Sequence, residues 1–187
     1  MSVNQRGFSL TEVLIAMAIG SILMLSSARF LPGLQQVILR QEAKQDLEED
    51  AWLSVMAIGK QIQRAGYCVG QCQGAGLIIS QDGHCVIVQW DANSNGRWEN
   101  SPNSEAEQTG FRLASGVLET QRGATHCDGK GWDKLTDPDR VLVQNFSVRQ
   151  NALAGFSPEF VIELSASRKG FENSPVQVLH YVTGFNL

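Results

Sequence analysis

A nearly unbroken apolar segment, Phe8 to Ala28, lies close to the start of the chain. As a helix its 21 residues rise about 31 Å, which is close to the hydrocarbon thickness of a bilayer. The sequence therefore predicts a membrane-spanning helix near the N-terminus. Glu12 lies inside this segment, where a carboxylate costs about 2.5–3.5 kcal/mol on insertion scales. It therefore needs either a compensating partner or a functional role.

An ordinary secretory signal peptide is the first alternative. Val13 to Leu25 would be its apolar region, and Ser26-Ser27-Ala28 its small-residue cleavage site. Cleavage after Ala28 would release a secreted periplasmic protein that begins at Arg29. This interpretation explains the length of the segment but leaves Glu12 and the residues before it unexplained.

The run Gly7-Phe8-Ser9-Leu10-Thr11-Glu12 resembles the processing site of type IV prepilins and pseudopilins. The resemblance implies that a prepilin peptidase removes residues 1–7 by cutting after Gly7, and that the new N-terminal residue, Phe8, is N-methylated. It also implies that Glu12 meets the N-terminal ammonium of a neighbouring subunit. Glu12 would then set the register of assembly.

Later segments resemble minor pilins, which are similar in plan to the J-type minor pseudopilins of type II secretion. The segments are Trp90–Gly96, Gly129–Asp133, Gly155–Pro158 and Val182–Leu187. The resemblance implies a non-enzymatic subunit that initiates or caps a pilus or pseudopilus. Its expected partners are prepilin peptidase, other minor pilins, the major pilin, the inner-membrane assembly platform and the lipid bilayer. A major structural pilin is the second alternative.

The resemblance also implies a location and a division of the chain. The protein is expected to cross the inner membrane once, with its C-terminal domain in the periplasm, and then to enter the fibre. Residues 1–7 form the leader, 8–33 the transmembrane and assembly helix, and 34–187 the globular domain.

Leu34 to Ala65 has the spacing of an amphipathic helix, which Gly66 ends. Trp52 and Met56 are expected to widen its apolar stripe. Pro32-Gly33, just before it, predicts either a kink or the end of the membrane helix. The stripe consists of Leu47, Ala51, Val55, Ile58, Ile62 and Ala65.

Beyond Gly66 the pattern changes to short strands, with Asp82-Gly83 as a hairpin turn. The fold class is therefore α+β, in which a long N-terminal helix packs on an antiparallel sheet, as in type IV pilins. The expected strands are Gly76–Ser80, Cys85–Trp90, Phe111–Leu113, Val117–Thr120, Val141–Val148, Phe160–Ser165 and Val176–Val182.

Four cysteines, Cys68, Cys72, Cys85 and Cys127, follow the apolar segment. An even number in a small domain predicts two disulfides and an extracytoplasmic location. Three pairings are open. Cys68–Cys72 with Cys85–Cys127 is slightly favoured, because the second bridge would tie the middle of the sheet to a later loop. A zinc site or a catalytic dithiol fits the spacing less well.

Asp91 to Glu99 matches the first half of an EF-hand calcium loop, and calcium is the one cofactor that the sequence suggests. The expected ligands are the side chains of Asp91, Asn93, Asn95 and Glu99 and the carbonyl of Arg97. The twelfth position is Pro102, so Glu105 or Glu107 could complete the site if the loop folds back. The alternative is a polar loop held by Asx-turns.

Other functions find little support. A net charge of −4 and a pI near 5.4 argue against nucleic acid as a direct partner. The loop Gly129–Asp133 lacks the ending of a phosphate-binding loop. His84, His126 and His180 are scattered, and we expect each to lie in a solvated loop rather than in a catalytic triad.

Overall fold

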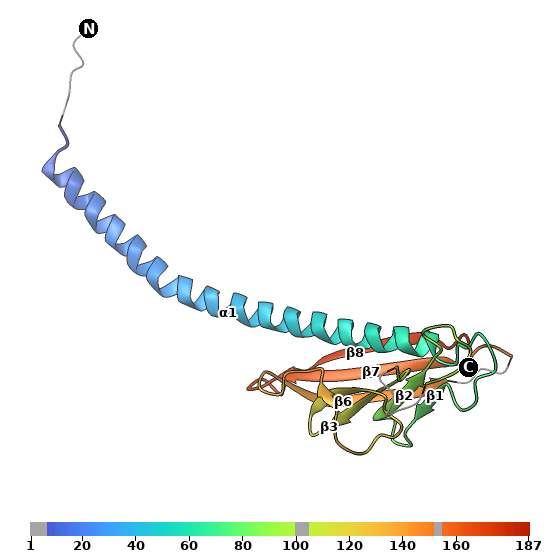
Figure 1. The fold of residues 1–187 in the computed structure, drawn as a ribbon. Coiled ribbons are helices and arrows are strands. Elements are labelled where there is room, and N and C mark those ends of the chain that lie inside the picture. Colours follow the sequence, from blue (N-terminus) through green and yellow to red (C-terminus); the bar gives the residue numbers. More distant parts are fainter. Residues whose placement is uncertain (1–6, 100–104, 152–154) are drawn as a thin grey trace, which may run out of the picture. The chain divides into compact units, whose positions relative to one another are not determined.

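One long helix, α1 (Leu10–Arg64), enters both compact units of the chain, Met1–Ala43 and Lys44–Leu187 (Figure 1). This computed structural model describes residues 7–99, 105–151 and 155–187. In the first unit, every described side chain is exposed except Gly20 and Ala43, which are half-buried. By length and composition α1 can cross a membrane. The predicted apolar helix therefore finds no covering surface within its own unit.

Helix α1 continues through Pro32 without a break. The interpretation of Pro32-Gly33 as the end of the membrane helix is therefore wrong. Proline has no backbone N–H, so the carbonyl four residues earlier, on Ala28, loses its helical partner.

The second unit contains an antiparallel five-stranded sheet in the order β1-β2-β3-β4-β5. Each strand pairs with the next along the chain, with Cys85 opposite Arg112 and Gly110 opposite Gln121. The strands are β1 (Leu77–Ile79), β2 (Cys85–Gln89), β3 (Gln108–Ala114), β4 (Val117–Arg122) and β5 (Asp133–Lys134).

A separate three-stranded antiparallel sheet follows, in the order β6-β7-β8. Its strands are β6 (Val141–Asn151), β7 (Glu159–Arg168) and β8 (Val176–Thr183). The expected α+β class is confirmed, but the strands form two sheets rather than one. Backbone bonds join the sheets where Val143 N–H donates to Gly116 and Val148 N–H to Gly83.

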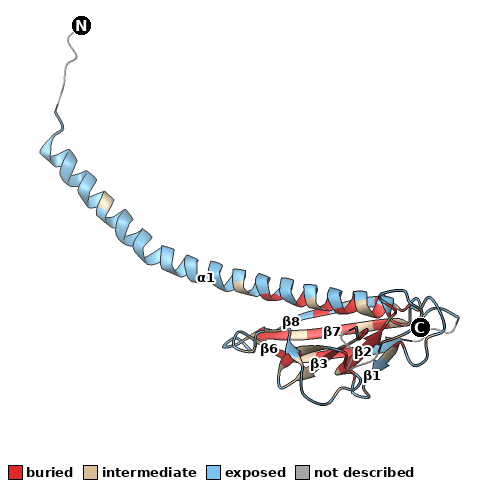
Figure 2. Ribbon diagram, in the orientation of Figure 1, coloured by how far each residue is buried: buried red, intermediate tan, exposed pale blue. Residues whose placement is uncertain are grey.

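The predicted apolar stripe of the second half of α1 is buried and lies in the main core (Figure 2). Val55, Ile58 and Ile62 are fully buried, and burial of each such side chain is worth about 1.5–3 kcal/mol. Trp52 and Met56 do not widen the stripe as expected. Both remain exposed. Gly59 packs directly against His180 of β8 and lies at the edge of the buried face of α1, and Trp52 and Met56 lie on the far side of Gly59 from the buried stripe.

Candidate functional site

Glu12 lies in the first turn of α1, where it caps the helix. Its Oε2 accepts the backbone N–H of Ser9 at 2.9 Å, and the Ser9 carbonyl accepts the N–H of Val13. Ser9-x-x-Glu12 is therefore half of a capping box, in which a Glu at the third helical position satisfies the N–H of the capping residue. The spacing was visible in the sequence, although the prediction considered Glu12 only as an intermolecular partner.

The residues around the predicted cleavage bond are accessible. Phe8 is 88% exposed, and nothing lies within 4 Å of the position that a side chain on Gly7 would occupy. Gly7 to Ser9 precede the helix, so no helical hydrogen bond needs to break before a protease reaches the Gly7–Phe8 bond. Most of the leader, including Arg6, lies outside the described residues.

Asp91 is the centre of the second site, and its side chain is fully buried. Oδ2 accepts the N–H of Val69 at 3.1 Å and of Gly96 at 2.9 Å, and Oδ1 accepts the N–H of Asn95 at 3.0 Å. Burial raises the pKa of Asp91, but the N–H donors lower it by more, so its pKa lies below the ordinary value. The carboxylate fastens the loop after β2 to the segment that follows α1.

The loop does fold back to Glu107, which sequence reasoning named only conditionally. Glu107 is buried, and its Oε1 accepts the N–H groups of Ala92 at 2.6 Å and Asn93 at 3.2 Å. The side-chain amides of Asn93 and Asn95 donate to the carboxylate of Glu99. These are the contacts of a polar loop held by its own turns.

The expected calcium ligands are therefore close together but engaged with protein donors. Asn93 Oδ1 accepts the N–H of Asn95, and Asn95 Oδ1 accepts the N–H of Arg97. Pro102 lies outside the described residues. Calcium binding stays a prediction for Asp91, Asn93, Asn95, Arg97 and Glu99.

The two disulfides of the structure are Cys68–Cys72 and Cys85–Cys127, the pairing that the sequence slightly favoured. The sulfur atoms of Cys68 and Cys72 lie within 4.8 Å of a carboxylate oxygen of Asp91. Because both sulfur atoms are joined in a disulfide, they are not available as thiolate ligands for zinc. This bridge instead closes a short loop beside Asp91.

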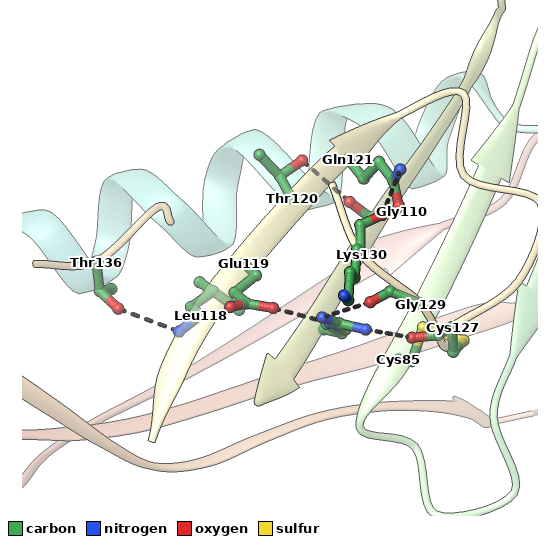
Figure 3. A network of polar contacts seen from close by, with 11 residues as sticks. Cys85, Gly110, Leu118, Glu119, Thr120, Gln121, Cys127, Gly129, Lys130 and Thr136 are labelled. Atoms are coloured by element: carbon green, nitrogen blue, oxygen red, sulfur yellow. Dashed lines mark hydrogen bonds and ion pairs between the residues drawn. A yellow bond between two sulfur atoms is a disulfide. The ribbon is translucent and has the colours of Figure 1, made fainter. Parts of the chain in front are cut away.

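The second disulfide holds a loop against the outer face of the five-stranded sheet (Figure 3). The guanidinium of Arg112 donates to Glu119 at 2.8 Å and to the carbonyl of Cys127 at 2.7 Å. The same guanidinium lies 4.3 Å from the ring centre of Trp132, which packs against Gly110.

The loop of residues 129–133 is held against the sheet by hydrogen bonds to its backbone carbonyls. Gly129 directs its carbonyl at Arg112, and Lys130 directs its carbonyl at Gln121, so this loop presents acceptors rather than the N–H groups that a phosphate would need (Figure 3).

Two of the three histidines differ from the expected solvated loops. His180 lies within β8, where its ring is 6.5 Å from that of Trp52. His84 lies in the turn before β2, half-buried, with Nδ1 against the carbonyl of Phe146. His126 is exposed and contacts Thr125. Their separate surroundings give no catalytic arrangement among these three side chains.

Family models match both the N-terminal segment and most of the rest of the chain. Residues 40–184 match the family model of prepilin peptidase-dependent protein B, and residues 3–28 match the prokaryotic N-terminal methylation motif. The chain is 52% identical to prepilin peptidase-dependent protein B of Escherichia coli K12 over 187 residues, which is the full length of both proteins.

A solved structure has a similar fold. It is a type IV-like pilin from Thermus thermophilus, with a TM-score of 0.53 at 14% identity. The match covers 76% of this chain and 98% of the other.

Proposed function

The chain belongs to the family of prepilin peptidase-dependent protein B, and from this we propose that it is a minor pilin that helps to initiate or cap a pilus or a type II secretion pseudopilus. The protein is type IV pilin-like, with an N-terminal methylation motif. Its family and fold are those of structural subunits. Its N-terminal apolar helix and its pilin motif fit a membrane-anchored protein with a soluble C-terminal domain.

Glu12 is the observation that carries the proposal. It is the one acidic residue between Phe8 and Gln41, in the part of α1 whose apolar side chains are exposed. A neighbour's free N-terminal amine, with a reference pKa of about 7.7–8.0, is largely cationic at neutral pH. Pairing with that amine would offset the burial cost of Glu12 when two spanning helices come together.

Cleavage after Gly7 supplies this amine. Hydrolysis of the Gly7–Phe8 bond leaves Phe8 with a free α-amino group, which methylation would keep cationic. Prepilin peptidase is thus a partner of the precursor. The exposure of Gly7 and Phe8 supports access of the peptidase to this bond.

Mass spectrometry of the mature N-terminus tests the proposal. We expect a chain that begins at methylated Phe8. An unmodified chain that begins at Arg29 would establish the signal-peptide alternative. A chain that keeps its leader in cells with an active prepilin peptidase would refute the proposed processing.

Copy number separates a minor pilin from a major one. A subunit that initiates or caps a fibre is needed in few copies, so sheared fibres should contain trace amounts of this chain relative to the major pilin. Quantitative mass spectrometry measures the ratio. Comparable amounts would favour the major-pilin alternative.

We also propose a periplasmic location for the second unit, with the assembly platform and the other pilins as partners. Its two disulfides support an oxidising compartment such as the bacterial periplasm. Exclusion of a membrane-impermeant protease by an intact outer membrane, and digestion once that membrane is permeabilised, would test this location.

Calcium binding is a separate proposal for the Asp91 loop, supported by the convergence of Asp91, Asn93, Asn95 and Glu99. Isothermal titration of the oxidised protein with calcium tests it. Heat of binding that Asp91→Ala abolishes would support the site. The absence of heat up to about millimolar calcium, the weak end of the range for such loops, would remove it.

A further inference from the structure

Asn95-Gly96 is the one Asn-Gly pair of the sequence, and it lies in the loop that Asp91 holds. Asparagine is one of the thermolabile residues of proteins, because its side-chain amide can be attacked by the backbone nitrogen of the next residue. Glycine has no side chain to shield that nitrogen, so it permits the closest approach. On sequence grounds, the exposed Asn95 is therefore the asparagine of this chain most open to the reaction.

The turn requires glycine at position 96. Gly96 has a φ of 80°, in the left-handed region that favours glycine. Its backbone also lies close to Gly70, where an added side chain would come within 3.1 Å of the Gly96 carbonyl oxygen. A bulkier residue after Asn95 would strain the loop, so protection of Asn95 has to come from other contacts.

Asp91 holds the attacking nitrogen. The Gly96 N–H donates to Oδ2 of the buried Asp91 at 2.9 Å. Deamidation requires this nitrogen to give up its proton as it bonds to Cγ of Asn95, and a charge-assisted hydrogen bond stabilises the N–H with its proton in place. The N–H of Asn95 donates to Asp91 Oδ1 at 3.0 Å, so the backbone is fixed on both sides of the Asn95–Gly96 bond.

Two further contacts fix the amide that would be attacked. Asn95 Oδ1 accepts the N–H of Arg97 at 2.9 Å, and Asn95 Nδ2 donates to Glu99 Oε1 at 2.7 Å. For the Gly96 nitrogen to bond to Cγ, the Asn95 side chain must leave these partners. The folded loop therefore restrains both the nucleophile and the group that it attacks.

We propose that Asn95 is a deamidation site, which the carboxylates of Asp91 and Glu99 keep unreactive while the loop is folded. In the reaction the Gly96 nitrogen bonds to Cγ of Asn95, and the Cγ–Nδ2 bond breaks. Nδ2 leaves as ammonia with the proton that the Gly96 nitrogen gives up. Water then opens the resulting succinimide ring to aspartate or isoaspartate, so the step consumes one water and needs no oxidant or reductant.

The product would weaken the loop that suppresses the reaction. A carboxylate at position 95 would replace the amide that donates to Glu99, and two carboxylates in that place repel each other. Isoaspartate would also lengthen the backbone beside Gly96. The modification, once made, therefore removes the contacts that hold the Asp91 loop closed.

Incubation of the full-length chain in detergent at neutral pH tests the proposal, below the melting temperature of each variant and with a chelator to keep calcium from the loop. Peptide mass spectrometry measures the aspartate and isoaspartate that form at position 95. The urea-unfolded chain gives the unrestrained rate. Asn173-Ser174, an exposed pair outside the loop, is the internal reference.

In the folded parent chain, we expect position 95 to react more slowly than in the unfolded chain by about tenfold or more, the factor for one charge-assisted hydrogen bond. Asp91→Ala should remove most of this protection. Val55→Ala is the control, because it weakens the fully buried core without touching the loop, and it should accelerate the reaction less. Asn173 should react at the same rate in all three folded proteins.

Three results would overturn the proposal. The first is equal rates at position 95 in the folded and unfolded parent. The second is an unchanged or slower reaction in Asp91→Ala, and a slower one would mean that Asp91 removes the Gly96 proton instead of holding it. The third is equal acceleration by Val55→Ala and Asp91→Ala, because opening of the whole unit would then control the reaction.

Glu99→Ala decides the question if Asp91→Ala does not fold. It removes the carboxylate that binds Asn95 Nδ2 but keeps the backbone contacts of residue 99 with Glu107. Faster deamidation at position 95 in folded Glu99→Ala than in the parent supports the proposal. An unchanged rate would refute it.

Discussion

At the scale of residues, Glu12 has two alternative partners. In the structure its carboxylate accepts the N–H of Ser9, whereas the proposed assembly brings it to a neighbour's ammonium. A charge-assisted hydrogen bond to the ammonium is stronger than one to a neutral N–H. The capping contact therefore supports Glu12 in the isolated subunit, and the proposed ion pair would replace or join it on docking.

Substitution of Glu12 separates these two roles. Glutamine can still accept the N–H of Ser9 but carries no charge, whereas alanine can do neither. If pairing with the ammonium drives assembly, Glu12→Gln and Glu12→Ala both reduce co-assembly, by about tenfold or more for a lost charge-assisted bond of roughly 1.5–3 kcal/mol.

Recovery of other pilins with the detergent-solubilised chain measures this effect, and equal membrane insertion of the three proteins is the control. Full recovery with Glu12→Gln but not with Glu12→Ala would show that helix capping, not charge, is what matters.

Asp91 makes the stability of the second unit depend on pH. Its pKa is lower in the folded chain than in the unfolded one, because its backbone N–H donors outweigh the effect of burial. This stabilisation is fully present above the ordinary pKa of about 3.9 and is lost as the pH falls through the lower folded value. The melting temperature should therefore fall on acidification below about pH 4.

The matched variant is Asp91→Asn, which cannot ionise. It should melt lower than the parent chain at neutral pH, and the difference should shrink in acid. Asp82 and Glu172, whose pKa values are also lowered, remain in both proteins. Thermal unfolding followed by circular dichroism gives the comparison. A difference that stays constant with pH would show that ionised Asp91 is not the cause.

At the scale of elements, the sequence predicts those segments that have one strong apolar period. The stripe from Leu47 to Ala65 and the alternation in β7 arise from burial on one face, which the residue order records directly. Strand β5 was missed because Asp133–Lys134 is two exposed charged residues with no alternation. Strand β3 begins at Gln108, earlier than predicted, because polar residues there pair with β2 rather than enter the main core.

Contacts between residues far apart in the sequence were harder to predict from the sequence. The Asn-rich loop indicates turns locally, but the Val69 N–H that holds Asp91 comes from 22 residues earlier. The division into two sheets depends on tertiary packing, which no local pattern encodes. At Ser9 and Glu12, by contrast, the capping signal was present in the sequence.

The two disulfides should contribute unequally to stability. The chain-entropy relation gives about 4 kcal/mol for a bridge that spans 42 residues and about 2 kcal/mol for one that spans four. Replacement of Cys85 and Cys127 by serine should therefore lower the free energy of unfolding more than replacement of Cys68 and Cys72. Guanidinium unfolding of the full-length chain in detergent measures both losses. Equal losses would mean that local contacts around Asp91 matter as much as loop closure.

At the scale of the whole molecule, the residues that stabilise the fold and those proposed to drive assembly lie in different units of the chain. Every residue of the main core lies between Leu47 and Val182. The described part of the first unit, residues 7–43, has exposed apolar side chains from Phe8 to Leu39 and contributes none of them to that core. The first unit therefore needs a bilayer or other subunits, whereas the second unit has its own core.

A fragment consisting of Lys44–Leu187 should accordingly fold by itself. It retains both disulfides and the entire buried stripe of α1, so its melting temperature in water should lie within about 4 °C of the corresponding transition of the full-length chain, a difference of roughly 1 kcal/mol or less. It should also fail to recover other pilins, because it lacks Phe8 and Glu12. Circular dichroism and co-purification measure the two properties separately. An unfolded fragment would show that residues before Lys44 stabilise the domain. A folded fragment that recovers pilins as efficiently as the full-length chain would place the assembly determinants in the second unit.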